Sequence, residues 1–576
     1  MNTLVIVLIA AVVLVCAYAG YGRWLAKTWG VDPNAKTPAV RLEDGKDYVP
    51  TNGWTVFAHQ FSSIAGAGPV TGAIQAAAFG WLPVLLWVLI GGVFFGAVTD
   101  FGALYASVKN DGKSMGLLIE KYIGKTGRKL FLLFCWLFCG IVIAAFADMV
   151  AGTFNAFDAE GAPVEAAFTN GAAGMVSIMF MVFAVVFGFI QKKFNFSGWR
   201  EAVIGIIFIV LSFAIGMNCP LVFGKAAWSY ITFVYIFFAA VLPMWMLKQP
   251  RDYMTTFMFG AMIAGAVIGL LVAHPTMNLP VFTGFNNAKL GTMFPILFVT
   301  VACGAVSGFH SLVSSGTSSK TVENEKDMLK VGYGAMVLES LLAVLALCVA
   351  GAAAAADGTP ATGTPVQIFS RGVAGFFEMF GVPVSIATVF MTMCVSALAL
   401  TSLDAVARIG RMSFQELFSV DDMEHAEGWR KLCCNVYFST FITLVFGFIL
   451  TQIGYANIWP LFGSANQLLS ALVLATLCVF LKVTGRNNKM LFPPLVIMLC
   501  VTFTALVQRL IAMVKAISAA ASTAIPAGET TWGAVFIANG LQLILAVLLI
   551  VLGLNIVFHS VKSYTTCDAP EAKATV

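Results

Sequence analysis

Four titratable side chains lie within long apolar stretches of this sequence: His59, Asp100, His310 and Glu339. Charged groups at membrane depth are costly and by default mark the paths of ions or substrates. Histidine exchanges its proton near neutral pH, and a carboxyl group removed from water keeps its proton more readily. No basic residue lies near Asp100, His310 or Glu339 in the sequence, and we take all four residues as candidates for proton coupling. Binding of a metal ion by His59, Asp100 and His310 is the alternative, although the spacing of these residues matches no metal-binding motif.

Two stretches rich in glycine indicate where the backbone itself could bind a ligand. Residues 64–72 read IAGAGPVTG, and residues 303–310 read CGAVSGFH, followed by SSGT at 314–317. Glycine removes side-chain bulk and Pro69 removes a backbone donor, so both predicted spans should be interrupted near mid-membrane. Paired interruptions point to a transporter's binding site, whereas close helix packing is the alternative explanation. The candidate substrate-binding residues are Ala65, Gly66, Ala67, Gly68, Gly304, Ser307, Gly308, Phe309 and His310.

Apolar helices must position these groups, and the composition predicts many of them. Of 576 residues, 59% are hydrophobic and only 11% are charged. A soluble domain carries about 25% charged residues, so lipid must be part of the solvent of this chain. A membrane-spanning helix needs about 20 mostly apolar residues. Fifteen segments meet this criterion, near 3–20, 54–80, 82–108, 130–154, 171–190, 201–217, 229–247, 254–273, 291–318, 331–355, 383–403, 432–453, 459–481, 490–510 and 532–557.

The basic residues predict the orientation of these spans. With the N-terminus outside, 28 of the 33 Lys and Arg residues fall in loops or the C-terminal tail on the cytoplasmic side. Cytoplasmic loops are expected to hold this excess, and the opposite orientation would reverse it. The basic residues are therefore topology signals and do not indicate a nucleic-acid surface. In this arrangement span 54–80 runs outward and span 291–318 runs inward, the relation that an inverted repeat requires.

Other chemistry is poorly supported by the sequence. No extramembrane stretch is long enough for a soluble catalytic domain, no HExxH, GxSxG or P-loop motif occurs, and the twelve cysteines include no CxxC pair. The chain is therefore not expected to be an enzyme, to bind a metal ion or to need a cofactor. Asp404 and Arg408 are spaced for an i,i+4 structural salt bridge at the inner end of a span, and Asp148 is expected to be solvated near the outer interface.

Several motifs in order along the chain resemble the carbon starvation protein A family. They are YVPT at 48–51, HQF at 59–61, IAGAGP at 64–69, DF at 100–101, VLP at 241–243, PRDY at 250–253, ACGAVSGFH at 302–310, SSGT at 314–317, WPLFG at 459–463 and ANQ at 465–467. The resemblance implies an inner-membrane secondary transporter related to the amino-acid–polyamine–organocation superfamily. It also implies uptake of peptides or pyruvate driven by protons.

The same resemblance implies an all-α, LeuT-like core of five-plus-five inverted repeats, with broken first helices and extra peripheral helices. Residues 366–380 then fall where this fold places an outer lid. Thr401 and Ser402 fall where sodium-coupled relatives place adjacent hydroxyls, so they form a candidate sodium site with the carbonyls near Ala65 and Gly66. Hydroxyls bonded back to their own helix are the alternative. The implied division is 1–30, an accessory helix; 31–53, a cytoplasmic loop; 54–217, the first repeat; 218–290, two intervening helices; 291–481, the second repeat; and 482–576, C-terminal helices and a cytoplasmic tail.

The sequence thus predicts a multi-pass transporter in a bacterial inner membrane, with its N-terminus outside and its C-terminus in the cytoplasm. We expect it to import small carboxylate-bearing nutrients, short peptides or pyruvate, by proton symport through alternating access. Sodium-coupled uptake of the same substrates is one alternative, and a transporter-like nutrient sensor is another. The choice between peptide and pyruvate and the oligomeric state stay open at this point.

Overall fold

The computed structural model describes residues 2–567 except 46, 159, 195–197, 244, 288–289, 421–426 and 523–531. The predicted tail beyond 567 and residues 421–426 of a predicted loop lie outside the described residues. The described chain is mostly helical, with one small hairpin in which β1 (Asn286–Asn287) pairs antiparallel with β2 (Gly291–Thr292).

The helices fall into two groups by length. The longer ones are α1 (Thr3–Ala17), α4 (Gly53–Ile64), α6 (Trp81–Gly91), α7 (Ala97–Val108), α9 (Lys125–Phe154), α10 (Ala167–Phe194), α11 (Trp199–Asn218), α12 (Lys225–Val241), α13 (Lys248–Ala273), α16 (Ala335–Ala353), α17 (Pro365–Glu378), α18 (Val384–Phe418), α20 (Val436–Thr451), α21 (Tyr455–Val483), α22 (Phe492–Ser522) and α23 (Trp532–Thr566). The shorter ones are α2 (Arg23–Trp29), α3 (Pro38–Arg41), α5 (Gly68–Ala76), α8 (Met115–Tyr122), α14 (Met293–Thr300), α15 (Gly308–Gly316) and α19 (Gly428–Cys434).

Eleven continuous helical segments within the described residues are long and apolar enough to cross a membrane, so the chain is a multi-pass membrane protein. The count becomes twelve if α19 and α20, bent by 69°, form one span. The predicted count of fifteen is not confirmed, and the difference has a physical cause. The predicted spans 54–80 and 291–318 are each divided into two helices that are too short to cross a membrane. The helix at the predicted span 229–247, α12, has only 17 residues.

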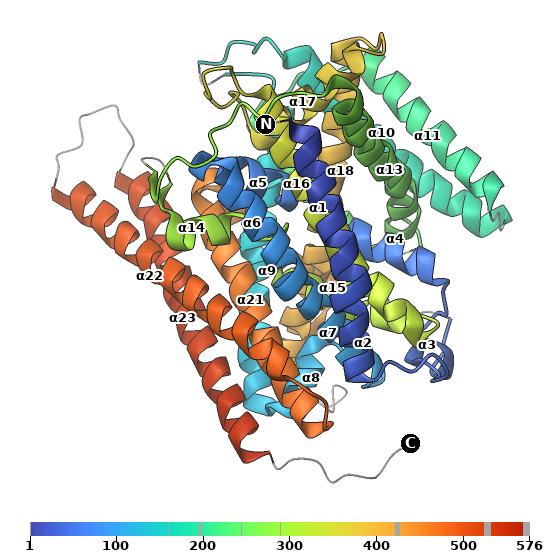
Figure 1. Ribbon diagram of the computed structural model, residues 1–576, viewed down its shortest axis with the longest axis vertical. Coiled ribbons are helices and arrows are strands. Elements are labelled where there is room, and N and C mark those ends of the chain that lie inside the picture. The colour runs from blue at the N-terminus through green and yellow to red at the C-terminus, as the bar shows by residue number, and fades with distance from the viewer. Residues whose placement is uncertain are drawn as a thin grey trace.

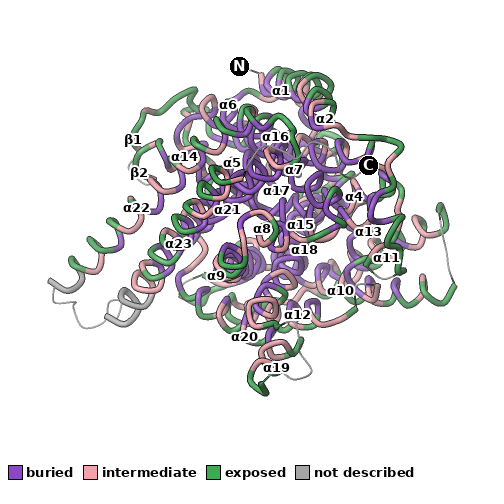
Figure 2. The backbone as a smooth tube through the Cα atoms, turned by 90° about the horizontal axis from the view of Figure 1, so that it is seen from below, coloured by how far each residue is buried: buried purple, intermediate pink, exposed green. Residues whose placement is uncertain are grey.

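Burial separates central helices from peripheral ones. The most apolar window of α21 is 100% buried and that of α9 is 83% buried, whereas the window of α11 is only 17% buried. Helix α9 packs against α18, α20 and α21. Figure 1 shows α22 and α23 along one side of the bundle and α10 and α11 on the opposite side. Figure 2 shows the buried residues gathered around α5, α7, α15, α16 and α18. The short helices α5 and α15 are therefore held at the centre by longer ones.

Helix α17 covers most of residues 366–380, the segment assigned to an outer lid. It begins with a capping box, in which the Thr364 hydroxyl accepts from the Gln367 amide and the Gln367 side chain accepts from the Thr364 amide. Its Phe376 and Phe377 lie against Gly269 and Gly265 of α13, where added side chains would collide with the rings. The amphipathic sequence thus forms a short helix that packs across α13.

Candidate functional site

Both predicted interruptions are present near the centre of the bundle. Helix α4 ends at Ile64 and α5 begins at Gly68, so three residues lie between them; α14 ends at Thr300 and α15 begins at Gly308. Pro69 occupies the first turn of α5, where its missing N–H would in any case have no helical partner. In the second interruption Ser307 is extended, with φ −134° and ψ 125°. Two stretches of non-helical backbone therefore lie within the buried part of the protein.

The two interruptions contact each other. A Cβ atom added to Gly68 would lie 2.5 Å from the Sγ of Cys303 and 2.8 Å from its Cβ. A Cβ atom added to Gly304 would lie 3.6 Å from the Cα of Pro69. Gly68 is thus needed for this close approach, since a larger residue would meet Cys303, whereas a side chain at 304 would first meet Ala343 of α16, whose Cβ would lie 2.6 Å away. Residues that are far apart in the sequence form one buried centre.

Asn466 of α21 caps the second interruption. Its side-chain oxygen accepts from the amide of Phe309 at 3.1 Å, and its side-chain nitrogen donates to the Ser307 hydroxyl at 3.0 Å. It is completely buried. The N-terminus of α15 is therefore partly satisfied by Asn466, whereas no side chain among the described residues caps the N-terminus of α5. Asn466 was not among the predicted site residues. Its polar side chain within the apolar span 459–481 is the feature of the sequence that could have identified it.

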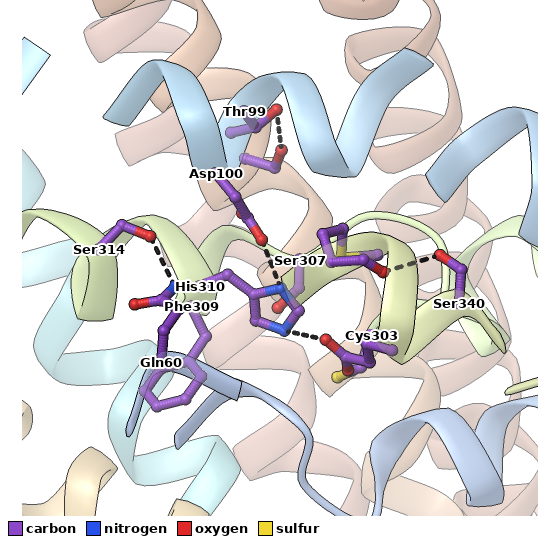
Figure 3. A network of polar contacts seen from close by, with 12 residues as sticks. Gln60, Thr99, Asp100, Cys303, Ser307, Phe309, His310, Ser314 and Ser340 are labelled. Carbon is purple, nitrogen blue, oxygen red and sulfur yellow. Dashed lines mark hydrogen bonds and ion pairs between the residues drawn. The ribbon is translucent and has the colours of Figure 1, made fainter. Parts of the chain in front are cut away.

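Three of the four titratable candidates meet beside the second interruption. The Nδ1 atom of His310 lies 3.0 Å from Asp100 Oδ2, and its Nε2 atom lies 3.3 Å from Glu339 Oε2. All three side chains are 0% exposed. Figure 3 shows Asp100 of α7 directed at the imidazole of His310 on α15. One histidine is therefore bracketed by two fully buried carboxylates, and Glu339 Oε1 and Asp100 Oδ1 have no hydrogen-bond partner within the described chain.

His59 lies in a different cluster. Its Nδ1 atom is 3.6 Å from Asp252 Oδ2, and Asp252 Oδ1 accepts from Arg251 at 3.0 Å. Arg251 also forms an ion pair with Asp404, which accepts a hydrogen bond of 2.8 Å from the hydroxyl of Tyr235. The predicted proton-coupling residue His59 thus faces α13 and does not join the other three candidates.

The predicted pair between Asp404 and Arg408 is replaced by other contacts. The carboxylate of Asp404 pairs with Arg251 of α13, and the Arg408 guanidinium donates to the carbonyls of Ala239 and Leu242 at the end of α12. Local spacing favours i,i+4 pairs, but the tertiary fold brings a better-buried cation to Asp404. Asp148 also differs from its predicted solvation, because Lys225 lies 2.8 Å from it and the amide of Tyr455 donates to it at 2.8 Å.

Replacing Arg251 by alanine is expected to destabilise the folded protein by about 3–5 kcal/mol, because it leaves Asp252 and Asp404 buried without their cation. Thermal unfolding of purified protein, followed by size-exclusion chromatography after heating, measures the change. The matched control is Arg41→Ala, because the Arg41–Asp111 pair is about half exposed and exposed pairs contribute about 0–1 kcal/mol. Equal shifts for both variants would contradict this account of the buried cluster.

The two candidate sodium hydroxyls behave differently. Thr401 donates to the carbonyl of Ala397 on its own helix at 2.8 Å. Ser402 is buried, its hydroxyl has no hydrogen-bond partner within the described chain, and it lies directly against Gly66. Only the Ser402 hydroxyl, and not that of Thr401, is therefore available to bind an ion at the first interruption. It lies against Gly66, the residue that follows Ala65. Within the described residues no group of three or more His, Cys, Asp or Glu side chains is arranged to hold a metal ion.

A cavity of about 730 Å³ lies on the predicted outer side of the two interruptions. It reaches Ile74 and Gln75 of α5 and Thr300, the last residue of α14, and it is bordered by Pro365 and Ile368 of α17. Cavities of this volume accommodate small organic ligands. The residues of the breaks at 65–68 and 303–310 do not line it, so the cavity ends just outside the buried centre.

Comparisons with known proteins agree in pointing to one family. The model of the family described as "Carbon starvation protein CstA" matches residues 2–362 and 351–505. The Peptide transporter CstA of Escherichia coli is 31% identical over 88% of this chain and 80% of its own length, and that of Bacillus subtilis is 31% identical over 85% and 87%. The Pyruvate/proton symporter BtsT of Escherichia coli is 36% identical over 61% of this chain and 49% of its own length.

Solved structures show only distant likeness. A manganese transporter of Eremococcus coleocola aligns with 91% of this chain and 99% of its own, at 11% identity and a TM-score of 0.46. MhsT in complex with L-phenylalanine aligns with 88% of this chain and 99% of its own, at 12% identity and a TM-score of 0.45.

Proposed function

This chain belongs to the carbon starvation protein CstA family, and from that premise we propose that it is a secondary active transporter importing short peptides or pyruvate by proton symport. The observation that carries the proposal is the buried contact of His310 with Asp100 and Glu339, beside the place where two interrupted helices meet. Peptides and pyruvate share a carboxylate, and relatives named for each occur among the similar proteins.

The proton is assigned to the Asp100–His310–Glu339 triad because of its charge. With the imidazolium and both carboxylates ionised, the three buried groups carry one net negative charge, which is costly away from water. One further proton neutralises the triad, and removing it restores the charge. A proton bound on the outer side and released on the inner side would therefore be linked to the position of α15, on which His310 lies.

The substrate carboxylate is assigned to the first interruption. The N-terminal amides of α5 carry a partial positive charge and receive no cap from a side chain in the described part of the protein, whereas the amide of Phe309 already donates to Asn466. Of the predicted substrate-binding residues, those at 65–68 are thus better placed to bind an anion than those at 304–310. His59 is assigned no role in proton coupling, because it contacts Asp252 instead of the triad.

Alternating access is proposed around this centre. Residues 54–217 and 291–481 would form two inverted repeats whose first helices are the pairs α4/α5 and α14/α15. The orientation with the N-terminus outside and the C-terminus in the cytoplasm, in a bacterial inner membrane, is supported by the distribution of basic residues. In this orientation the 730 Å³ cavity opens towards the outside, and α17 borders it as a lid.

Uptake of labelled solutes by purified protein in liposomes tests the proposal. Labelled pyruvate and a labelled dipeptide would each be supplied with an inward proton gradient and, separately, with an inward sodium gradient. We expect accumulation of one of these solutes under the proton gradient alone. Absence of uptake of both solutes under either gradient, by protein shown to be folded, would refute the proposed function.

Sodium coupling is the second candidate, because the Ser402 hydroxyl is unpartnered beside Gly66. Under the proton proposal, Ser402→Ala should leave proton-driven uptake within about twofold of wild type, since the hydroxyl loses no hydrogen bond. The measurement is initial uptake rate at several sodium concentrations, with Thr401→Ala as the neighbouring control. A rate that falls about tenfold in Ser402→Ala and is restored only by high sodium would favour sodium as the coupling ion.

A further inference from the structure

Among the described residues, a single charged one lines the outer cavity. Of the residues around its volume of about 730 Å³, all are apolar or neutral except Arg509 of α22. The neutral polar residues include Gln75, Tyr455 and Asn457. A charge at this depth is costly unless a partner or a function compensates it, so the surroundings of Arg509 decide how it should be interpreted.

The guanidinium of Arg509 is held in place but not neutralised. Its Nη2 atom donates to the side-chain oxygen of Gln542 at 2.7 Å and to the backbone carbonyl of Asn457 at 2.8 Å, and its Nε atom donates to Gln542 at 3.2 Å. Both acceptors are neutral, and no carboxylate forms an ion pair with Arg509 within the described chain. Its Nη1 atom makes no hydrogen bond to the described residues. A positioned cation with a free donor therefore faces a cavity of ligand size.

The cavity leads from this cation towards the proposed binding centre and ends just outside it. Its inner end includes Ile74 of α5 and Thr300, which precedes the second interruption. Trp459 lines the same space and donates to the carbonyl of Thr300 at 3.4 Å. An anion that reaches Arg509 from outside is thus in the same space as the C-terminal end of α5 and the last residue of α14, one step before the breaks.

We propose that Arg509 is an outer docking site for the carboxylate of the substrate, which it attracts into the cavity before the substrate reaches the buried centre. This inference rests on the proposed transport of carboxylates. A guanidinium matches the planar geometry of a carboxylate, and a charge in a cavity with low-dielectric walls raises the local concentration of oppositely charged solutes. Because the contact is made before transport, it acts on KM and leaves the maximal rate unchanged.

Transport kinetics give the first test. Replacing Arg509 by glutamine should raise the KM for the carboxylate substrate about tenfold, because a focused charge raises the local concentration of an oppositely charged solute by at least about that factor. The maximal rate should stay unchanged. Arg509→Lys should retain most of the effect of the charge. The matched control is Lys515→Gln, because Lys515 is exposed on the same helix and does not line the cavity. An unchanged KM in Arg509→Gln would overturn the inference.

Thiol labelling gives a second test that needs no transport. Ala512 lines the cavity about one helical turn beyond Arg509, so a cysteine in Ala512→Cys should react with methanethiosulfonate reagents added from outside. The ratio of the rates for an anionic and a cationic reagent should fall about tenfold when Arg509→Gln is added, and Lys515→Gln should leave it unchanged. Background labelling is measured in the same protein with Ala512 intact.

The two tests separate this inference from the proposed function. If wild-type protein takes up no carboxylate, the proposed function fails, and the labelling ratio still decides whether Arg509 creates an anion-attracting field. An unreactive Ala512→Cys, or a ratio that does not depend on Arg509, would overturn the docking site even if wild-type uptake is normal.

Discussion

Asp100→Asn is expected to abolish proton-driven accumulation of substrate while exchange of labelled for unlabelled substrate continues. The asparagine has nearly the same shape but no exchangeable carboxyl proton, so the triad with His310 and Glu339 can no longer change its charge in the same way. Exchange requires the substrate site to move between the two sides without net proton transfer. We expect gradient-driven accumulation to fall at least about 100-fold, equivalent to about 2.7 kcal/mol.

The control for this prediction is Asp111→Asn, which removes a carboxylate from an exposed pair with Arg41. Its accumulation should stay close to that of wild type, because exposed pairs contribute little. Full proton-driven accumulation by Asp100→Asn would remove the triad from the coupling mechanism. Loss of both accumulation and exchange would instead indicate damage to the substrate site.

Gly68→Ala is expected to reduce uptake about 100-fold through steric conflict between the two interruptions. The new methyl group would stand 2.5 Å from Cys303 Sγ, much closer than the normal contact distance between these atoms. Overpacking of a well-packed interior typically costs about 1–3 kcal/mol, and here the strain falls on the amides proposed to bind the substrate. Initial uptake rates, normalised to folded protein in the liposomes, give the measurement.

Two further variants sharpen this prediction. Gly152→Ala is the matched control, since nothing lies within 4 Å of a Cβ atom at that position. Cys303→Ala removes the sulfur that the new methyl group meets, so the double variant with Gly68→Ala should recover part of the lost uptake. Normal uptake by Gly68→Ala would show that the contact between the breaks is not needed for transport.

The local features of the fold could be predicted from the sequence because their causes are local. The clustered glycines at 66–72, with Pro69, and those at 304 and 308 weaken the helix locally, and the segment predicted at 366–380 largely coincides with α17. Long apolar runs predict spans for the same reason. The count of spans was less secure, because an interrupted helix and a 17-residue helix satisfy a composition criterion without being continuous membrane-length helices.

The partners of the charged residues could not be read from the sequence. His310 and Asp100 are 210 positions apart, and only the packing of α15 against α7 brings them together. The packing of α13 against α4 and α18 brings His59 to Asp252 and gives Asp404 a partner in Arg251 instead of Arg408. Sequence spacing describes neighbours on one helix, whereas buried charges are satisfied by whichever helix the fold places beside them.

The most direct test of proton symport is the movement of protons with substrate through the wild-type protein. Liposomes containing a trapped pH-sensitive dye would receive pyruvate or a dipeptide outside, at equal internal and external pH, with an inward-negative membrane potential. The account predicts that the transported solute acidifies the interior at the rate of its own uptake, and that sodium is not required. Uptake of the solute without internal acidification would contradict it.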